Sequence, residues 1–93
     1  MPESQNNGVR DEVHLAEEVG ELVHARRTEL RMTQVQLAER ARMTQPQLSR
    51  LEVGGVVPTL PVLVRLARAL DSDLIITLAP RAGRDAGAEG AAR

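Results

Sequence analysis

The sequence contains no cysteine, no aromatic residue and no long uninterrupted apolar run. Without cysteine the chain has no disulfide, no thiol nucleophile and no thiolate metal ligand, which leaves an intracellular location unopposed. Without Phe, Tyr or Trp the core must consist of Leu, Val, Ile, Ala and Met, and we expect helices packed through aliphatic seams. A chain of 93 residues forms one small domain at most, and dimerisation would bury more of its surface.

No segment has the character of a signal peptide or a membrane span. The N-terminal stretch MPESQNNGVRDE lacks a positive region followed by apolar residues. The most apolar stretch, residues 53–64, is broken by two glycines and two prolines and is too short to cross a bilayer. We therefore expect a soluble, cytoplasmic protein without a membrane partner.

The net charge of -1 hides an uneven distribution of charge. Residues 1–24 carry six acids against one arginine, whereas residues 25–70 carry eight arginines against three glutamates. The chain therefore has an acidic leader at -5 followed by a basic middle at +5.

Four helices are predicted from apolar spacing and capping signals, so the expected fold class is all-α. Residues 1–10 are polar and are expected to form a flexible N-terminus. The first helix is expected from Asp11 to about Leu30, and the others begin at Thr33, Thr44 and Thr59. Gly54 and Gly55 end the third helix, and the fourth runs to Leu70.

One short β-strand is predicted after the last helix. It consists of Leu74, Ile75, Ile76, Thr77 and Leu78, which are rich in β-branched side chains and are followed by Pro80. A lone strand needs a partner, and pairing with the same strand of a second subunit across a two-fold axis supplies one. The alternative is that residues 74–78 extend as coil against the helices. The domain then covers residues 11–79, and residues 80–93 are predicted to be a disordered tail.

The frame Thr-Gln-x-Gln-Leu occurs twice, as TQVQL at 33–37 and TQPQL at 44–48. In each copy the threonine and the second glutamine match a capping box, which marks a helix start. A single helix through both copies is excluded because the ring of Pro46 would clash with the carbonyl of Arg42, at a cost of about 3 kcal/mol. Two short helices joined by a tight turn form a helix-turn-helix unit.

The two-helix stretch TQVQLAERARMTQPQLSRLEVG and the following VVPTLPVLVRLARAL resemble the Cro/C1-type (XRE-family) DNA-binding domain over residues 19–70. The resemblance implies a lambda-repressor-like helical bundle whose third helix lies in the major groove of double-stranded DNA. It implies phosphate contacts for Gln34 and Thr44. It implies base reading for Gln45, Pro46, Ser49 and Arg50, since glutamine pairs with adenine and arginine with guanine. The alternative is that these are solvated surface side chains.

The resemblance also implies a structural ion pair between Arg27 of the first helix and Glu52 of the third. One departure from the family pattern is Arg42 at a turn position usually given to glycine, so that Arg42 either adopts a left-handed conformation or marks a different turn.

Nothing in the sequence predicts catalysis, a cofactor or a metal site. His14 and His24 lie ten residues apart without a third ligand and are expected on the surface. No serine has a histidine placed to activate it, and no glycine-rich loop is placed to hold a nucleotide.

The predicted function is a homodimeric transcriptional repressor that binds an inverted-repeat operator. The chain is similar to antitoxins of the HigA and HipB type, and DLIITLAP lies where HipB-like antitoxins form an intersubunit two-stranded sheet. That similarity implies autorepression and a cognate toxin on which the acidic leader could dock. The alternatives are a stand-alone regulator without a toxin and a protein-interaction adaptor that has lost DNA binding.

Overall fold

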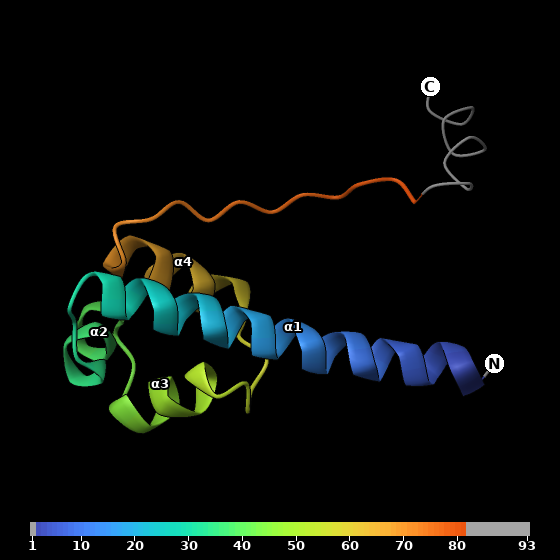
Figure 1. Ribbon diagram of the computed structural model, residues 1–93, viewed down its shortest axis with the longest axis horizontal. Coiled ribbons are helices and arrows are strands. Elements are labelled where there is room, and N and C mark those ends of the chain that lie inside the picture. Colours follow the sequence, from blue (N-terminus) through green and yellow to red (C-terminus); the bar gives the residue numbers. More distant parts are fainter. Residues whose placement is uncertain (1, 82–93) are drawn as a thin grey trace.

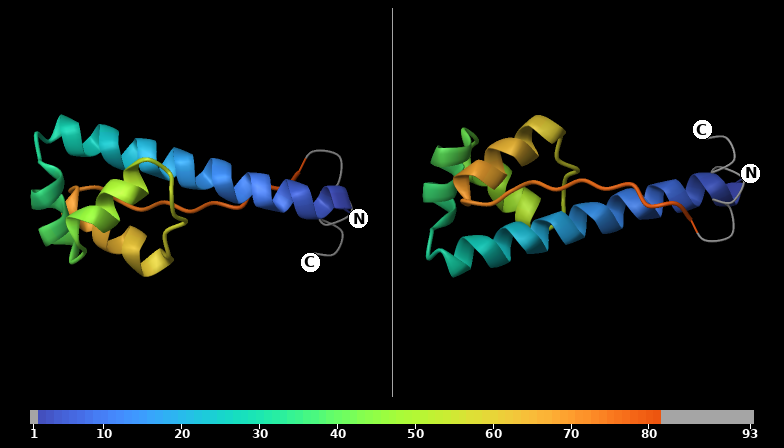
Figure 2. Two further views of the ribbon diagram at one scale, coloured as in Figure 1. Left: turned by 90° about the horizontal axis from the view of Figure 1, so that it is seen from below. Right: turned by 90° about the horizontal axis from the view of Figure 1, so that it is seen from above.

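The computed structural model describes residues 2–81, with side chains from residue 11 onward. It has four helices, α1 (Pro2–Glu29), α2 (Gln34–Ala41), α3 (Gln45–Glu52) and α4 (Leu60–Ala69), and no strand among the described residues. The all-α fold class is confirmed. The three short helices gather around the C-terminal half of α1, whose N-terminal half projects beyond them (Figures 1 and 2).

The first helix begins nine residues before the expected start at Asp11. Proline is compatible with a first helical turn, because the amide hydrogen that it lacks has no partner there. Gly8 costs only about 1 kcal/mol inside a helix and does not stop it. Residues 2–10, expected as a flexible start, are therefore the first turns of α1.

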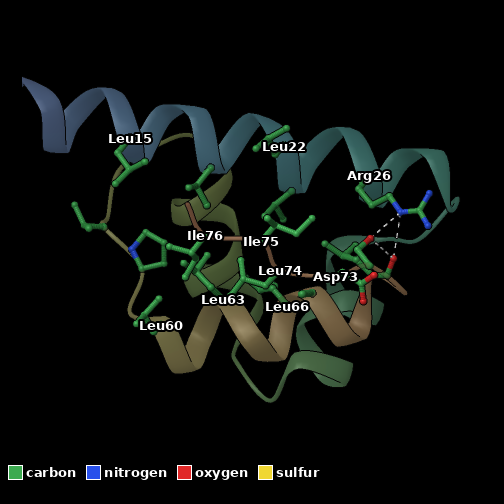
Figure 3. Close-up of a pocket in the computed structure, with 17 residues that line it drawn as sticks. Leu15, Leu22, Arg26, Leu60, Leu63, Leu66, Asp73, Leu74, Ile75 and Ile76 are labelled. Carbon is green, nitrogen blue, oxygen red and sulfur yellow. Dashed lines mark hydrogen bonds between the residues drawn. The ribbon is translucent and has the colours of Figure 1, made fainter. Parts of the chain in front are cut away.

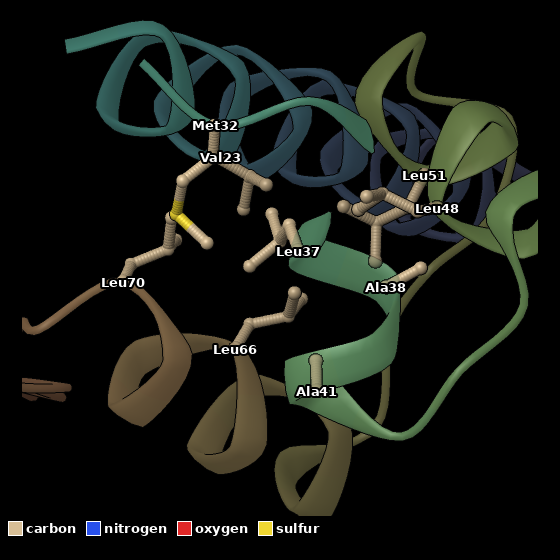
Figure 4. Packing of buried hydrophobic residues seen from close by; sticks show 9 residues of the cluster. All are labelled: Val23, Met32, Leu37, Ala38, Ala41, Leu48, Leu51, Leu66 and Leu70. Carbon is tan, nitrogen blue, oxygen red and sulfur yellow. The ribbon is translucent and has the colours of Figure 1, made fainter. Parts of the chain in front are cut away.

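The core is aliphatic, as the absence of aromatic residues requires. Leu37, Leu48 and Leu66 are the largest fully buried side chains and come from α2, α3 and α4. Around them lie six further aliphatic residues from α1, the α1–α2 turn, α2, α3 and the C-cap of α4 (Figure 4): Val23, Met32, Ala38, Ala41, Leu51 and Leu70. Helix α2 contributes three buried residues and packs against both α3 and α4, while α3 packs against α1.

The backbones of α1 and α3 approach each other closely at Gly20. A Cβ atom at this position would lie 2.5 Å from the carbonyl oxygen of Leu51 and 2.7 Å from that of Glu52. Only glycine leaves room for these carbonyl groups. The α1–α3 packing that positions α3 therefore depends on a residue without a side chain.

The fourth helix begins as predicted, with the Thr59 hydroxyl accepting from the amide of Val62 at 3.4 Å. It ends at Ala69 with Leu70 as its C-cap, and Asp71 then adopts a left-handed φ of 53°. The amide of Ser72 then returns to the carbonyl of Ala67 at 2.9 Å, which closes the helix end.

Residues 72–81 continue without regular structure and run away from α4 in the direction of the N-terminal half of α1 (Figures 1 and 2). Residues 74–78, predicted as a strand, are thus not a strand in the single chain. A strand requires hydrogen-bonded backbone on a neighbouring segment, and none of the described residues supplies one. Pairing with a second subunit stays a prediction, and the tail from residue 82 onward lies outside the described residues.

Among the described residues, no helix combines the length and apolarity needed to cross a membrane.

Candidate nucleic-acid interface

Helices α2 and α3 are joined by a turn of three residues at 42–44. Arg42 ends α2 in the left-handed conformation, with φ 60° and ψ 48°, which settles the alternative left open by the sequence. The amides of Arg42 and Met43 donate to the carbonyls of Glu39 and Ala38, at 3.2 and 2.9 Å. These bonds offset the cost of a left-handed non-glycine residue, about 1 to 2 kcal/mol.

Both predicted capping boxes are confirmed. The Thr33 hydroxyl accepts from the amide of Gln36 at 3.1 Å, and the Gln36 side chain accepts from the amide of Thr33 at 2.9 Å. Thr44 and Gln47 make the same two bonds at 3.2 and 2.8 Å. The second glutamine of each frame is therefore occupied at its own helix end, and the first glutamine of each, Gln34 or Gln45, is left for other contacts.

Helix α3 buries one side and exposes the other. Leu48 and Leu51 are buried, whereas Pro46 and Arg50 are exposed and Gln45 and Ser49 are half-buried. Pro46 occupies the first turn, where a missing amide hydrogen costs nothing. The residues expected to read bases are thus spread along the outer side of one short helix.

The two first glutamines of the doubled frame touch each other. The Gln45 side-chain amide donates to Oε1 of Gln34 at 2.6 Å, and the Gln34 amide donates to Oε1 of Glu52 at 3.1 Å. The residue expected at a phosphate and the residue expected at a base therefore belong to one chain of hydrogen bonds that ends on a buried carboxylate.

Arg27 and Glu52, expected to form a structural ion pair, lie in contact between α1 and α3. Nε of Arg27 donates to Oε2 of Glu52 at 2.6 Å, and Nη2 donates to Oε1 at 3.0 Å. Nη1 of the same guanidinium donates to the carbonyl of Met32 at 2.8 Å, which also ties down the α1–α2 turn. This fork geometry gives the pair its orientation.

The Glu52 side chain is only 4 % exposed. Burial alone would raise the pKa of its carboxyl, but hydrogen bonds from Arg27, His24 and Gln34 together outweigh burial and leave this pKa below its usual value. The hydrogen bond to Glu52 correspondingly raises the pKa of Arg27. Glu52 is therefore a stably ionised structural anchor at neutral pH.

Sequence reasoning did not connect His24 to this cluster. Its Nδ1 lies 3.0 Å from Oε1 of Glu52 and 3.2 Å from Nη2 of Arg27. One ring nitrogen cannot donate and accept at once. With a hydrogen on Nδ1, His24 donates to Glu52, which is the contact that helps to lower the pKa of Glu52; in the other tautomer Nδ1 accepts from Arg27 instead. The available signal was the spacing of His24 and Arg27, three residues apart on one helix face.

The expected dimer segment, residues 74–78, lies after α4 and takes no part in this cluster. Thr44 is exposed at the start of α3, where its hydroxyl serves the capping box. In the part of the chain that the structure describes, no three histidine or acidic residues gather closely enough to hold a metal ion.

A family model described as Helix-turn-helix matches residues 23–75, which is 53 of the 93 residues and includes all of α2, α3 and α4. No curated protein and no solved structure is significantly similar to the chain.

Proposed function

Because the chain belongs to the XRE-type helix-turn-helix family of DNA-binding regulators, we propose that it is a sequence-specific transcriptional repressor acting in the cytoplasm. In this proposal α3 enters the major groove and presents Gln45, Pro46, Ser49 and Arg50 to base edges. Gln34 and Thr44 lie at helix starts, where backbone amides favour phosphate oxygens, and would fix the position of the protein on the duplex.

The observation that carries this proposal is the hydrogen bond from Gln45 to Gln34 at 2.6 Å. It uses one hydrogen of the Gln45 amide and leaves the second hydrogen and the carbonyl oxygen for a ligand. One donor and one acceptor side by side are what adenine requires in the major groove. A side chain held in advance also loses less rotamer freedom on binding.

We further propose that the protein acts as a homodimer with two recognition helices related by a two-fold axis. Such a dimer binds an inverted repeat whose half-site centres lie about 10 bp apart, or a multiple of that. The exposed segment 74–78 supports this proposal, since its unpaired backbone can form a two-stranded sheet with a second copy.

The proposed biological role is that of a type II antitoxin that represses its own operon. The resemblance of segment 73–80 to the intersubunit strand of HipB-type antitoxins supports it. The exposed acids on the described part of α1 offer a surface for a basic toxin: Asp11, Glu12, Glu17, Glu18 and Glu21. Expressing the adjacent reading frame with and without this chain tests the role, and growth arrest relieved by co-expression is the expected result. A stand-alone regulator would give no such relief.

A titration with double-stranded DNA at two salt concentrations tests the DNA-binding proposal. Neutralisation of phosphates releases counterions, so the affinity should fall steeply as salt rises. The competing function is a protein-interaction adaptor. The net charge of -1 favours it, because DNA-binding proteins are generally basic. An affinity for duplex DNA that is absent at low salt, or unchanged by salt, would support the adaptor.

A further inference from the structure

An open apolar groove of about 630 Å³ lies between α1, α4 and the start of segment 72–81 (Figure 3). Leu15 and Leu22 line it from α1, and Leu60 and Leu63 line it from α4. Leu22 is 69 % exposed in the single chain, although it lies beside other apolar side chains. A contiguous apolar surface of this kind marks an interaction site.

One end of the groove is fixed by polar contacts. Nε of Arg26 donates to the carbonyl of Leu70 at 3.2 Å and to the hydroxyl of Ser72 at 3.1 Å (Figure 3). These bonds hold the start of segment 72–81 on α1. Apart from Asp73, the rest of the groove wall consists of apolar residues.

The same chain carries an apolar arm, residues 74–80, beside this groove. The arm has the sequence LIITLAP and contains no charged residue. Leu74, Ile75 and Ile76 border the groove, and Ile75 and Leu78 are 79 % and 98 % exposed. An open apolar groove and an exposed apolar arm therefore lie on one chain.

We propose that the groove receives the arm of a second copy, so that two arms pair antiparallel above the two grooves. This inference rests on the dimer proposed above and adds the surface on which the paired strands lie. Two strands alone are marginally stable in water and need a helical or sheet surface beneath them. The leucines of α1 and α4 provide that surface, and reciprocal exchange of identical arms gives a closed two-fold interface.

Charges at the two ends of the arm favour antiparallel pairing. The arm is preceded by Asp71 and Asp73 and followed by Arg81. An antiparallel register centred on Thr77 places Asp73 opposite Arg81 of the partner subunit, and the two-fold axis repeats that pair. Parallel pairing in register would instead place Asp73 opposite an identical aspartate, which is unfavourable.

The test is sedimentation of the full chain over a range of concentrations. Leu22→Glu places a charge in the proposed interface and should raise the dimer dissociation constant by roughly a hundredfold or more, since each dimer carries the change in both of its grooves. Val35→Glu adds the same charge at a half-exposed valine on α2, away from the groove, and should leave the dimer unchanged. Equal helicity by circular dichroism shows that both variants fold.

Charge reversal tests the register. Asp73→Arg or Arg81→Asp alone should weaken the dimer roughly two- to tenfold, and the double variant should recover most of the loss, because it restores opposite charges across the interface. Two weakened single variants without recovery in the double variant would overturn this register.

Three outcomes would overturn the groove as the dimer surface. The first is a wild-type chain that stays monomeric at all concentrations, as expected if the groove binds a different protein. The second is a Leu22→Glu variant that dimerises as tightly as wild type. The third is loss of the dimer in Ile76→Pro but not in Leu22→Glu, which would mean that the strands pair without using the groove. A failure of DNA binding is separate, since a wild-type dimer without salt-sensitive affinity for duplex DNA contradicts the repressor and not the groove.

Discussion

The side-chain amide of Gln45 donates to Oε1 of Gln34 across 2.6 Å, from the first turn of α3 to the first turn of α2. Gln34 is held in turn by Glu52, so a residue proposed to read bases is oriented by one proposed to contact phosphate. The two glutamines therefore act as one unit. The sequence alone indicates a separate role for each glutamine, and that description omits the hydrogen bond between them.

A double-mutant cycle should show this coupling. Gln45→Ala should weaken binding mainly to the preferred operator, whereas Gln34→Ala should weaken binding to all DNA and also reduce discrimination between sequences. We expect the two losses to be non-additive by about 0.5 to 2 kcal/mol, as for residues that share a hydrogen bond. Affinities of the four proteins for operator and random duplex measure the coupling. Strictly additive losses would show that the bond does not persist on DNA.

Arg50 is exposed on α3, and no hydrogen bond or ion pair holds its guanidinium among residues 11–81. We predict that Arg50→Ala costs about 1 to 3 kcal/mol of operator binding and relaxes preference at one base pair. Binding to a set of single-base operator variants measures this. Arg68→Ala removes an arginine that is also exposed, from α4, and serves as the control. A loss that is uniform over all base variants would assign Arg50 to phosphate.

The Arg27–Glu52 pair should dominate the acid sensitivity of the fold. The pKa of Glu52 is lowered in the folded state, so its contribution to stability is fully present above the unfolded pKa and is lost as pH falls through the folded pKa. Glu52→Gln should therefore be less stable than wild type at pH 7, with the difference shrinking below about pH 4. Urea unfolding at several pH values measures it. A difference that stays constant with pH would contradict this account.

Removing the other partner is more damaging, because it leaves a buried carboxylate without its guanidinium. Arg27→Ala should cost roughly 3 to 5 kcal/mol at pH 7, which is a large part of the stability of a small domain. Arg31→Ala removes an exposed arginine from the turn after α1 and is the matched control. Its effect should stay within about 0.5 kcal/mol. Equal losses for the two variants would mean that the ion pair contributes no more than a surface charge.

Local chemistry explains why the starts of α2, α3 and α4 could be predicted from the sequence. Thr33, Thr44 and Thr59 each cap a helix, and these bonds join residues only three positions apart. Pro46 separates α2 from α3 for a reason equally local, its clash in a continuous helix. Signals of this kind need no knowledge of the rest of the fold.

Contacts between distant residues could not be predicted in the same way. The bond from Gln45 to Gln34 and the approach of His24 to Glu52 depend on how α1, α2 and α3 cross. In the proposed dimer, the conformation of segment 72–81 would depend on a second copy, and one sequence does not specify that. The role of Gly20 also could not be predicted. A glycine inside a helical pattern is locally unfavourable, and the sequence does not show which helix packs against it.

Gly20→Ala tests whether the α1–α3 approach is as close as its geometry implies. In an unpacked helix this change would stabilise by about 1 kcal/mol. Here the added methyl group would lie 2.5 Å from the carbonyl oxygen of Leu51, a backbone atom that cannot rotate away. We therefore expect a net loss of about 1 to 3 kcal/mol, as for overpacked cores. Gly55→Ala is the comparison, because its closest contacts are Cγ of Arg50 at 3.1 Å and the carbonyl oxygen of Arg50 at 3.3 Å, both longer than those at Gly20, so it should cost less. Urea unfolding ranks the two variants. If Gly20→Ala proves as stable as wild type, α1 and α3 must be able to separate, and α3 would then not be rigidly positioned for DNA.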